Sequence, residues 1–196
     1  MIIEFWGPPR SGKSEQIKLL KKLYHMMGKT VEVIEDREIE KEINIPPEKA
    51  LEYNTLFFMK ILEKMLDSQS EIIILDRGFH DMPAWYIIEH FNKKITEEQL
   101  GVLISFCEIW QKFIDLAIFI DIDFKTSMLR HKNTGVTGIT DDYVINKEYL
   151  SLMRKAYDML KIKYSTHNIL FLDGRKEMMQ LHETIVEWLK TRHNPG

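Results

Sequence analysis

The stretch "GPPRSGKS" occupies residues 7–14, between the apolar run Ile2–Trp6 and a helical pattern that covers Ser14–Met27. Its spacing is that of a phosphate-binding loop, G-x-x-x-x-G-K-S, in the strand–loop–helix context that such a loop requires. Backbone amides around the second glycine and the positive end of the helix dipole attract phosphate oxygens. The stretch therefore predicts an α/β protein that binds a nucleotide directly after its first strand.

We expect every residue of the loop to contribute to nucleotide binding. Lys13 is expected to reach the β- and γ-phosphates, and the Ser14 hydroxyl to ligate Mg²⁺. ATP is the expected nucleotide, with Mg²⁺ as its ion. The alternative is a chance match on an ordinary tight turn. The predicted binding residues are Gly7, Pro8, Pro9, Arg10, Ser11, Gly12, Lys13 and Ser14.

Strand-length and helix-length patterns alternate along the rest of the chain. Apolar runs typical of buried strands cover Ile2–Trp6, Thr30–Ile34, Glu71–Leu75, Ala117–Ile122 and Asn168–Leu172. Helical patterns cover Ser14–Met27, Ala50–Leu66, Pro83–Phe91, Thr96–Ile114, Ile145–Tyr164 and Lys176–Lys190. Alternation of this kind requires crossover connections and a parallel sheet. We therefore predict one α/β domain over residues 1–196, with a five-stranded parallel sheet flanked by helices.

Composition excludes several classes of protein. Of the 196 residues, 44% are hydrophobic and 29% are charged, which is typical of a soluble globular protein. The net charge is −3 and no long basic run occurs, so we expect no nucleic-acid partner. No apolar run approaches membrane-spanning length, so we expect no membrane partner and a cytoplasmic location. Cys107 is the only cysteine, and its apolar surroundings predict a buried thiol.

Polar residues follow the second and third predicted strands, where ligands bind in such sheets. Asp76 is expected to hold Mg²⁺ or its water, and Arg77 to grip an acceptor phosphate bidentately. The alternative is that Asp76 caps a turn and pairs with Arg77 on the surface. Asp36 and Arg37 are expected to bind the acceptor at the same mouth. Asp81 also lies there, with capping of the next helix as its expected role.

The loop alone does not distinguish a switch, a motor and a kinase. A GTPase switch would need an Asn-Lys-x-Asp motif after a strand. The nearest string, Asn146-Lys147-Glu148-Tyr149, lies in a helical pattern and lacks the aspartate. The chain is short for a motor ATPase with its additional sensor elements. Length and alternation therefore favour a small-molecule kinase.

The stretch "DRGFHDMPAWY", residues 76–86, resembles a known family. Asp76-Arg77-Gly78 and Ala84-Trp85-Tyr86 have the spacing of the Asp-Arg-Tyr/His and Ala-Tyr-Gln motifs of thymidylate kinases, a branch of the P-loop nucleoside and nucleotide kinases. Arg37-Glu38 is similar to the Arg-Glu-Pro motif of that family. The resemblance spans nearly the whole chain. It implies a three-layer P-loop kinase fold and a lid over about residues 131–146, between two helices.

The resemblance also implies roles for two further arginines. In one group of thymidylate kinases the fourth loop residue is an arginine that contacts the transferring phosphoryl group, and Arg10 matches it. The interior of the predicted lid has no arginine, which is consistent with that role. An exposed arginine without a role is the alternative. Arg130, just before the lid, is expected to contact phosphate.

The residues that would identify the acceptor depart from the family. Pro9 stands where thymidylate kinases have an acid that contacts the sugar, and no arginine between Arg37 and Arg77 is available to read thymine. Phe57 could stack on a base, although a phenylalanine pair on an amphipathic helix packs into the core more often.

The acceptor is therefore predicted only as a small molecule, with a nucleoside monophosphate as the first choice. The second choice is a nucleoside or another hydroxyl compound, which would benefit from a general base. Glu35, Asp36, Glu38 and Asp76 are all placed for that role. A nucleotide-binding regulatory module with little turnover is the alternative from another class. An apolar face on the helices of Pro83–Ile114 would suit a homodimer, although core packing explains it equally well.

Overall fold

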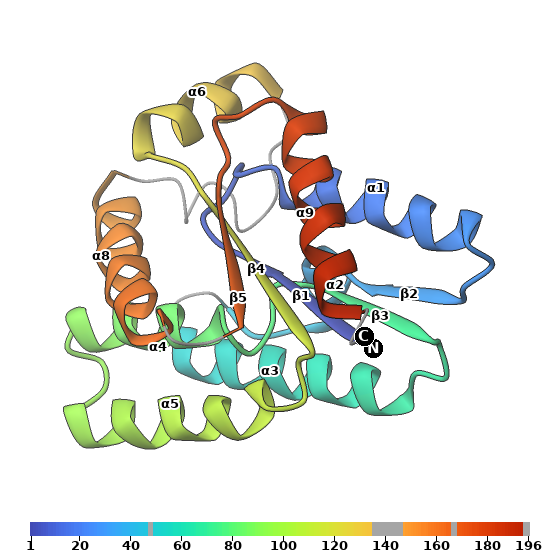
Figure 1. Cartoon of the computed structure of the whole chain (residues 1–196). Coiled ribbons are helices and arrows are strands. Elements are labelled where there is room, and N and C mark those ends of the chain that lie inside the picture. Colours follow the sequence, from blue (N-terminus) through green and yellow to red (C-terminus); the bar gives the residue numbers. More distant parts are fainter. Residues whose placement is uncertain (47–48, 135–146, 166–167, 194–196) are drawn as a thin grey trace.

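The computed structural model describes residues 1–46, 49–134, 147–165 and 168–193. A five-stranded parallel sheet runs through it in the order β2–β3–β1–β4–β5 (Figure 1). Its strands are β1 Ile2–Trp6, β2 Val31–Ile34, β3 Ile72–Asp76, β4 Leu116–Asp121 and β5 Ile169–Asp173. The direction of winding reverses beside β1. The carboxyl ends of β1 and β3 therefore border the crevice where ligands bind in such sheets.

Helices cover both faces of the sheet, so the fold has three layers (Figure 1). One face carries α1 Lys13–Met26 and α9 Met178–His193. The other carries α3 Ala50–Asp67, α4 Met82–Phe91, α5 Glu97–Gln111 and α8 Lys147–Lys163. Two further helices, α2 Asp36–Glu42 and α6 Phe124–Thr134, follow β2 and β4 closely.

The central strand β1 shows how its side chains divide between the two layers. Ile3 and Phe5 pack into the core beneath α1 and α9. Trp6 points to the opposite face, where it packs against α4 and α8. Glu4 is fully buried between these apolar residues. A buried carboxylate needs hydrogen-bonding partners, and those of Glu4 lie in the functional site.

The structure confirms the predicted five-stranded α/β fold. Each predicted strand and helix occurs within three residues of its predicted bounds. The helix α2 was not predicted, and α6 was predicted only as a helix before the lid. Residues 131–134 of the predicted lid form the last turn of α6, and residues 135–146 lie outside the described residues. Within the described ranges, no helix is both long and apolar enough to cross a membrane.

Candidate functional site

The loop of residues 7–14 curves around the carboxyl end of β1. Its two glycines have positive φ angles, 127° at Gly7 and 103° at Gly12, which side-chain-bearing residues rarely adopt. A Cβ atom at Gly7 would also lie 2.5 Å from the carbonyl oxygen of Ile120. Gly12 is the N-cap residue of α1. No side chain caps this helix start among the described residues, and the first amides of a helix form an anion site.

Lys13 is the first residue of α1, and its side chain turns back over the loop. The Nζ atom donates to the carbonyl oxygens of Gly7 and Pro8, both at 3.0 Å. Burial lowers the pKa of Lys13 to about 8, and the positive charge of Arg77 acts in the same direction. A bound phosphate would supply a strong negative partner for this buried ammonium.

Asp76 and Ser14 form the candidate metal site. Ser14 Oγ donates to Asp76 Oδ2 at 3.1 Å, whereas Asp76 Oδ1 is buried without a hydrogen-bond partner among the described residues. Burial raises the pKa of Asp76 to about 6, and the negative charge of Asp36 acts in the same direction. A carboxylate and a hydroxyl are the oxygen ligands that Mg²⁺ takes when substrate phosphates and waters complete its shell. The residues present therefore fit the ion.

Arg77 adopts a φ of 70°, an uncommon value for a residue other than glycine. Its amide donates to the carbonyl of Phe5 at 2.8 Å, which fixes this turn to β1. Its Nε lies 3.1 Å from Asp36 Oδ2, and its Nη1 lies 2.8 Å from Asp81 Oδ2. The guanidinium carbon also lies 5.5 Å from the centroid of the Trp85 ring. Two carboxylates and an aromatic face thus surround one guanidinium.

Asp81 is fully buried and accepts hydrogen bonds on both carboxylate oxygens. Oδ1 accepts from the amide of Gly7 at 3.2 Å and from the hydroxyl of Tyr157 at 2.7 Å. Oδ2 accepts from Arg77 and, at 2.9 Å, from Nε1 of Trp85. Burial alone would raise the pKa of Asp81, but the charge of Arg77 and these bonds lower it. Its side chain makes no capping hydrogen bond, so the capping role expected from the sequence is wrong.

Glu4 supports this turn from inside the sheet. Its Oε1 accepts from the amides of His80 at 2.8 Å and Asp81 at 3.3 Å, and its Oε2 lies 2.9 Å from His80 Nδ1. A Cβ atom at Gly78 would lie 2.9 Å from the carboxylate carbon of Glu4. Gly78, where thymidylate kinases have an aromatic residue, therefore makes room for Glu4. The sequence carried a signal for this role, because an acid inside an apolar strand needs a partner; no comparable signal marked Tyr157.

Two residues of α6 hold the loop from its outer side. Ser127 Oγ donates to the carbonyl of Pro9 at 2.9 Å. Arg130 Nη1 donates to the carbonyl of Arg10 at 3.1 Å, and its Nη2 donates to the carbonyl of Gly174 at 2.7 Å. Arg130 thus joins the loop to the segment after β5, and its contact with phosphate stays a prediction.

Three other residues that the sequence predicted for the site are Arg10, Arg37 and Phe57. Arg10 is half-buried with a φ of 62°, and its contact with a phosphoryl group stays a prediction. Arg37 is exposed on α2, so the structure does not bring its side chain to Arg77. Phe57 is 6% exposed and packs in the core beneath α3 and α4, as the core alternative predicted. Its stacking on a base stays a prediction.

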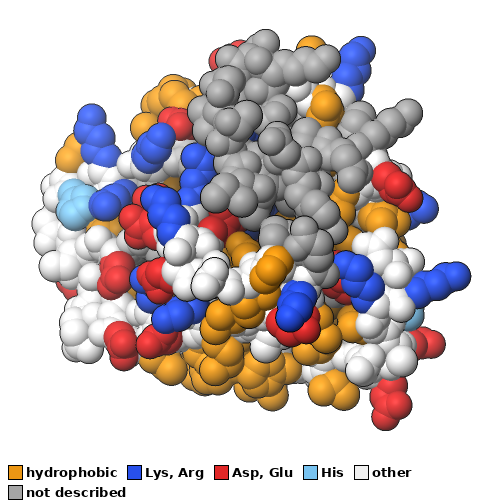
Figure 2. Space-filling view, turned by 180° about the vertical axis from the view of Figure 1, so that it is seen from behind, with side chains coloured by type: hydrophobic (Ala, Val, Ile, Leu, Met, Phe, Trp, Pro, Cys, Tyr) orange, Lys and Arg blue, Asp and Glu red, His pale blue; other side chains and the backbone are white. Residues whose placement is uncertain are grey.

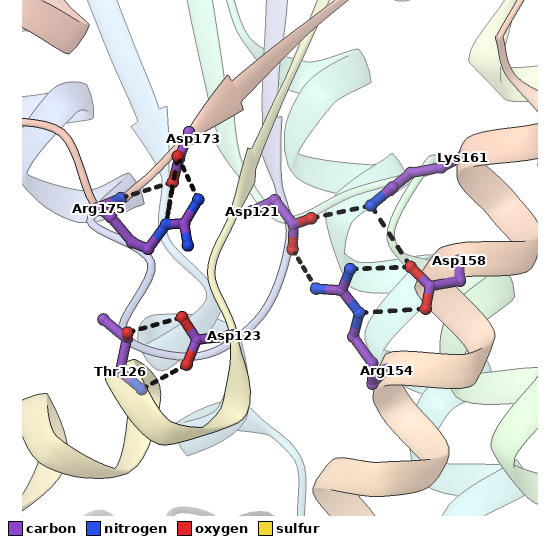
Figure 3. A network of polar contacts seen from close by, with 8 residues as sticks. All are labelled: Asp121, Asp123, Thr126, Arg154, Asp158, Lys161, Asp173 and Arg175. Atoms are coloured by element: carbon purple, nitrogen blue, oxygen red, sulfur yellow. Dashed lines mark hydrogen bonds and ion pairs between the residues drawn. The ribbon is translucent and has the colours of Figure 1, made fainter.

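A second polar network ties α8 to the end of β4 (Figure 3). Asp121 accepts from Arg154 Nη1 at 2.8 Å and from Lys161 Nζ at 2.9 Å. Both cations also contact Asp158, at 3.0 and 3.4 Å. Arg154, one of the basic residues that follow the predicted lid, is therefore paired with the sheet.

The same region contains a cleft of about 380 Å³ at the carboxyl ends of β4 and β5. Asp121 and Arg154 line one side, and Asp173 and Arg175, which form an ion pair at 2.7 Å, line the other. Figure 3 shows these two groups facing each other across the strand ends. The carboxylates on both sides already have cationic partners, so the cleft has no unpaired charge among these four residues.

Solved structures with the same fold include the deoxyadenosine kinase of M. mycoides in three ligand states. The structure with the products dCMP and a flexible dCDP has a TM-score of 0.72 at 18% identity. Those with dATP and with dCTP have TM-scores of 0.69 and 0.73 at 17% identity. Each comparison covers 97% of this chain and 100% of the kinase chain in the solved structure. No protein-family model matches the sequence. At this identity the likeness shows the fold alone, a five-stranded parallel sheet flanked by helices that this chain shares with that kinase.

Proposed function

We propose that the protein is an ATP-dependent phosphotransferase whose acceptor is the hydroxyl group of a nucleoside. The fold is shared with a deoxyadenosine kinase whose product dCMP carries one phosphate. The position of Lys13 on the loop and the pair of Ser14 and Asp76 support binding of a nucleoside triphosphate with its Mg²⁺. The observation that carries the choice of acceptor is the ion pair between Arg77 and Asp36.

The charges around Arg77 favour a neutral acceptor over a phosphate. A nucleoside monophosphate brings about two negative charges and needs an arginine that is available to bind them. Arg77 already contacts the carboxylates of Asp36 and Asp81, and Arg37 is exposed on α2. A hydroxyl acceptor instead needs a carboxylate that takes its proton. Asp36 is held at the mouth by Arg77 and is partly accessible, with 19% of its side chain exposed.

The roles of the other residues follow from their positions. Lys13 and the loop amides would hold the donor phosphates, and Arg10 would stabilise charge on the transferring phosphoryl group. Ser14 and Asp76 would hold Mg²⁺, which neutralises phosphate charge when bound. Arg77 would orient Asp36 and the acceptor. The thymidylate kinase assignment would instead require a phosphate acceptor at this same pair. The cytoplasmic location stays a prediction from composition.

Replacement of Asp36 by Asn tests the proposal. Removing a general base lowers turnover by about 10²–10⁴-fold, so kcat with a nucleoside should fall on that scale while ATP affinity changes little. Glu38→Gln is the matched control, because Glu38 is exposed on the same short helix. An unchanged kcat in Asp36→Asn, or a larger loss in Glu38→Gln, would exclude Asp36 as the base. A regulatory module would bind ATP and transfer no phosphate in any variant.

We also propose that α5 pairs with the same helix of a second copy. Val102, Phe106 and Ile109 of α5, and Phe113 in the turn directly after it, recur at helical spacing and are between 40% and 65% exposed. The Phe58 and Phe106 rings lie 5.0 Å apart, so α3 flanks this stripe. In Figure 2 hydrophobic side chains gather along the lower part of the molecule, where Figure 1 places α3 and α5.

Charge supports a second copy as the partner. Glu97 and Glu98 lie at the start of α5, and Lys112 lies at its end. A two-fold axis across the stripe would place Glu97 and Glu98 of each copy beside the C-cap residue Lys112 of the other.

A further inference from the structure

We propose that Asp81 is a positioning residue, which fixes Arg77, the arginine on the acceptor side of the site, relative to the phosphate loop. The inference rests on the proposed function. One carboxylate oxygen of Asp81 contacts the donor side, through the amide of Gly7, and the other contacts the acceptor side, through Arg77. Among the described residues, no other side chain is shown to contact both the Gly7 amide and the Arg77 guanidinium.

The hydrogen bonds of Asp81 leave it little freedom to move. Its two oxygens accept four hydrogen bonds, from Gly7, Tyr157, Arg77 and Trp85. Its backbone amide donates to the buried carboxylate of Glu4 at 3.3 Å. A fully buried carboxylate with these partners cannot rotate without leaving donors unsatisfied. The distance between the Gly7 amide and the Arg77 guanidinium is therefore set by a single rigid group.

Such a group matters because phosphoryl transfer depends mainly on the placement of donor and acceptor. A misplacement of about 1 Å can reduce a reaction rate by about 10²-fold. The donor phosphates lie on the loop that begins at Gly7, and the acceptor and its base lie beside Arg77. Asp81 connects these two parts without touching either substrate.

The first test replaces Asp81 by Asn, which keeps the shape and removes the charge. We expect kcat to fall by about 10²-fold, with a smaller change in the dissociation constant for ATP. Tyr157→Phe removes one bond on the donor side, and Trp85→Phe removes one on the acceptor side while it keeps an aromatic ring beside Arg77. Each of these milder variants should also lower kcat, by several-fold, even if Asp81→Asn folds poorly.

The control is Asp158→Asn, which neutralises a half-exposed acid of α8 that pairs with Arg154 and Lys161 in the network of Figure 3. Its kcat should equal that of the unmodified protein. The double variant Arg77→Lys/Asp81→Asn separates positioning from stability. If Asp81 acts through Arg77, the double variant should be no slower than Arg77→Lys alone.

Two results would overturn the inference. One is a loss of kcat in the double variant that equals the product of the losses in Arg77→Lys and Asp81→Asn. The other is normal kcat in Tyr157→Phe and Trp85→Phe at a temperature where both remain folded by circular dichroism. Kinetics are measured with whichever acceptor the unmodified protein phosphorylates. A wrong acceptor class is therefore revealed by the unmodified protein itself, whereas a wrong role for Asp81 is revealed only by the variants. If the unmodified protein transfers no phosphate, both the proposed function and this inference fail.

Discussion

Asp76 and Asp81 are both buried aspartates and lie five positions apart, yet the protein shifts their pKa values in opposite directions. Asp76 accepts a hydrogen bond from Ser14 on one oxygen and has no partner for the other among the described residues, so burial dominates and raises its pKa to about 6. Asp81 is also buried, but Arg77 and four hydrogen bonds favour its charged form and lower its pKa. The first arrangement suits a carboxylate that awaits a cation, and the second suits a structural anion.

These shifts predict opposite effects of two matched substitutions on stability. The pKa of Asp76 is higher in the folded than in the unfolded protein, so the folded state loses stability as pH rises from about 4 to about 6. At pH 7, Asp76→Asn should therefore raise the free energy of unfolding, by about 1–3 kcal/mol. The gain should shrink to below about 1 kcal/mol near pH 4, where Asp76 is protonated in the folded state and about half protonated in the unfolded state. Urea unfolding at pH 7 and pH 4 measures it.

Asp81→Asn is the matched comparison. A carboxyl whose pKa is lowered by folding contributes stability above its unfolded pKa, and this contribution is lost as pH falls through the folded pKa. The substitution should therefore destabilise the protein at pH 7. Destabilisation by Asp76→Asn at pH 7 would contradict our account of the metal site.

At the scale of elements, the phosphate loop is held between α6 and the segment after β5. Arg130 donates to the carbonyls of Arg10 and Gly174, and Ser127 donates to that of Pro9. A Cβ atom at Gly174 would lie 2.7 Å from the carbonyl oxygen of Ser11. The shape of the loop therefore depends on residues more than 100 positions away in the chain.

Gly174→Ala should disturb the loop because its methyl group would force the backbone of Ser11 to move. We expect a loss of about 1–3 kcal/mol in unfolding free energy and a clearly weaker affinity for ATP. Gly101→Ala is the control, because no described atom outside its own helix backbone and its chain neighbours lies within 4 Å of the added Cβ position, and alanine favours a helix. That variant should be as stable as the unmodified protein or more so. Equal ATP affinities in the two variants, measured by calorimetry, would refute the role of Gly174.

Sequence patterns predicted the elements well and their contacts less well. The loop motif and the alternation of apolar runs predicted the strand–loop–helix unit and the five parallel strands. The helix α2 was missed because its seven residues are mostly charged and bury only Ile39. The partners of Asp81 could not be predicted, because Gly7 and Tyr157 lie 74 and 76 residues away and meet it only after the sheet forms. The role of Glu4 could have been predicted, because an acid between apolar strand residues must be buried with hydrogen-bonding partners.

At the scale of the whole molecule, the stripe on α5 predicts a dimer. Phe106→Asp would place a charge in the centre of the pairing surface and should convert a dimer into a monomer in sedimentation equilibrium. Ile162→Asp is the control, since Ile162 is 78% exposed on α8 and lies outside the stripe. A monomeric unmodified protein, or a dimer that Ile162→Asp dissociates and Phe106→Asp does not, would contradict the proposed interface.

At the scale of the whole molecule, the fold and the charges of the site also bear on the chemical class of the acceptor. The sheet places Asp76 and Arg77 beside the loop, as the motifs predicted, but it adds Asp36 and Asp81 on either side of Arg77. A site with these charges should take a neutral hydroxyl in preference to a phosphate.

The most direct measurement mixes the protein with γ-labelled ATP, Mg²⁺ and equal concentrations of deoxynucleosides and their monophosphates, and identifies the labelled products by chromatography. The account predicts labelled nucleoside monophosphates, at a rate that falls sharply in Asp36→Asn. Labelled nucleoside diphosphates as the main product, or no labelled nucleotide product while ATP remains bound, would contradict it.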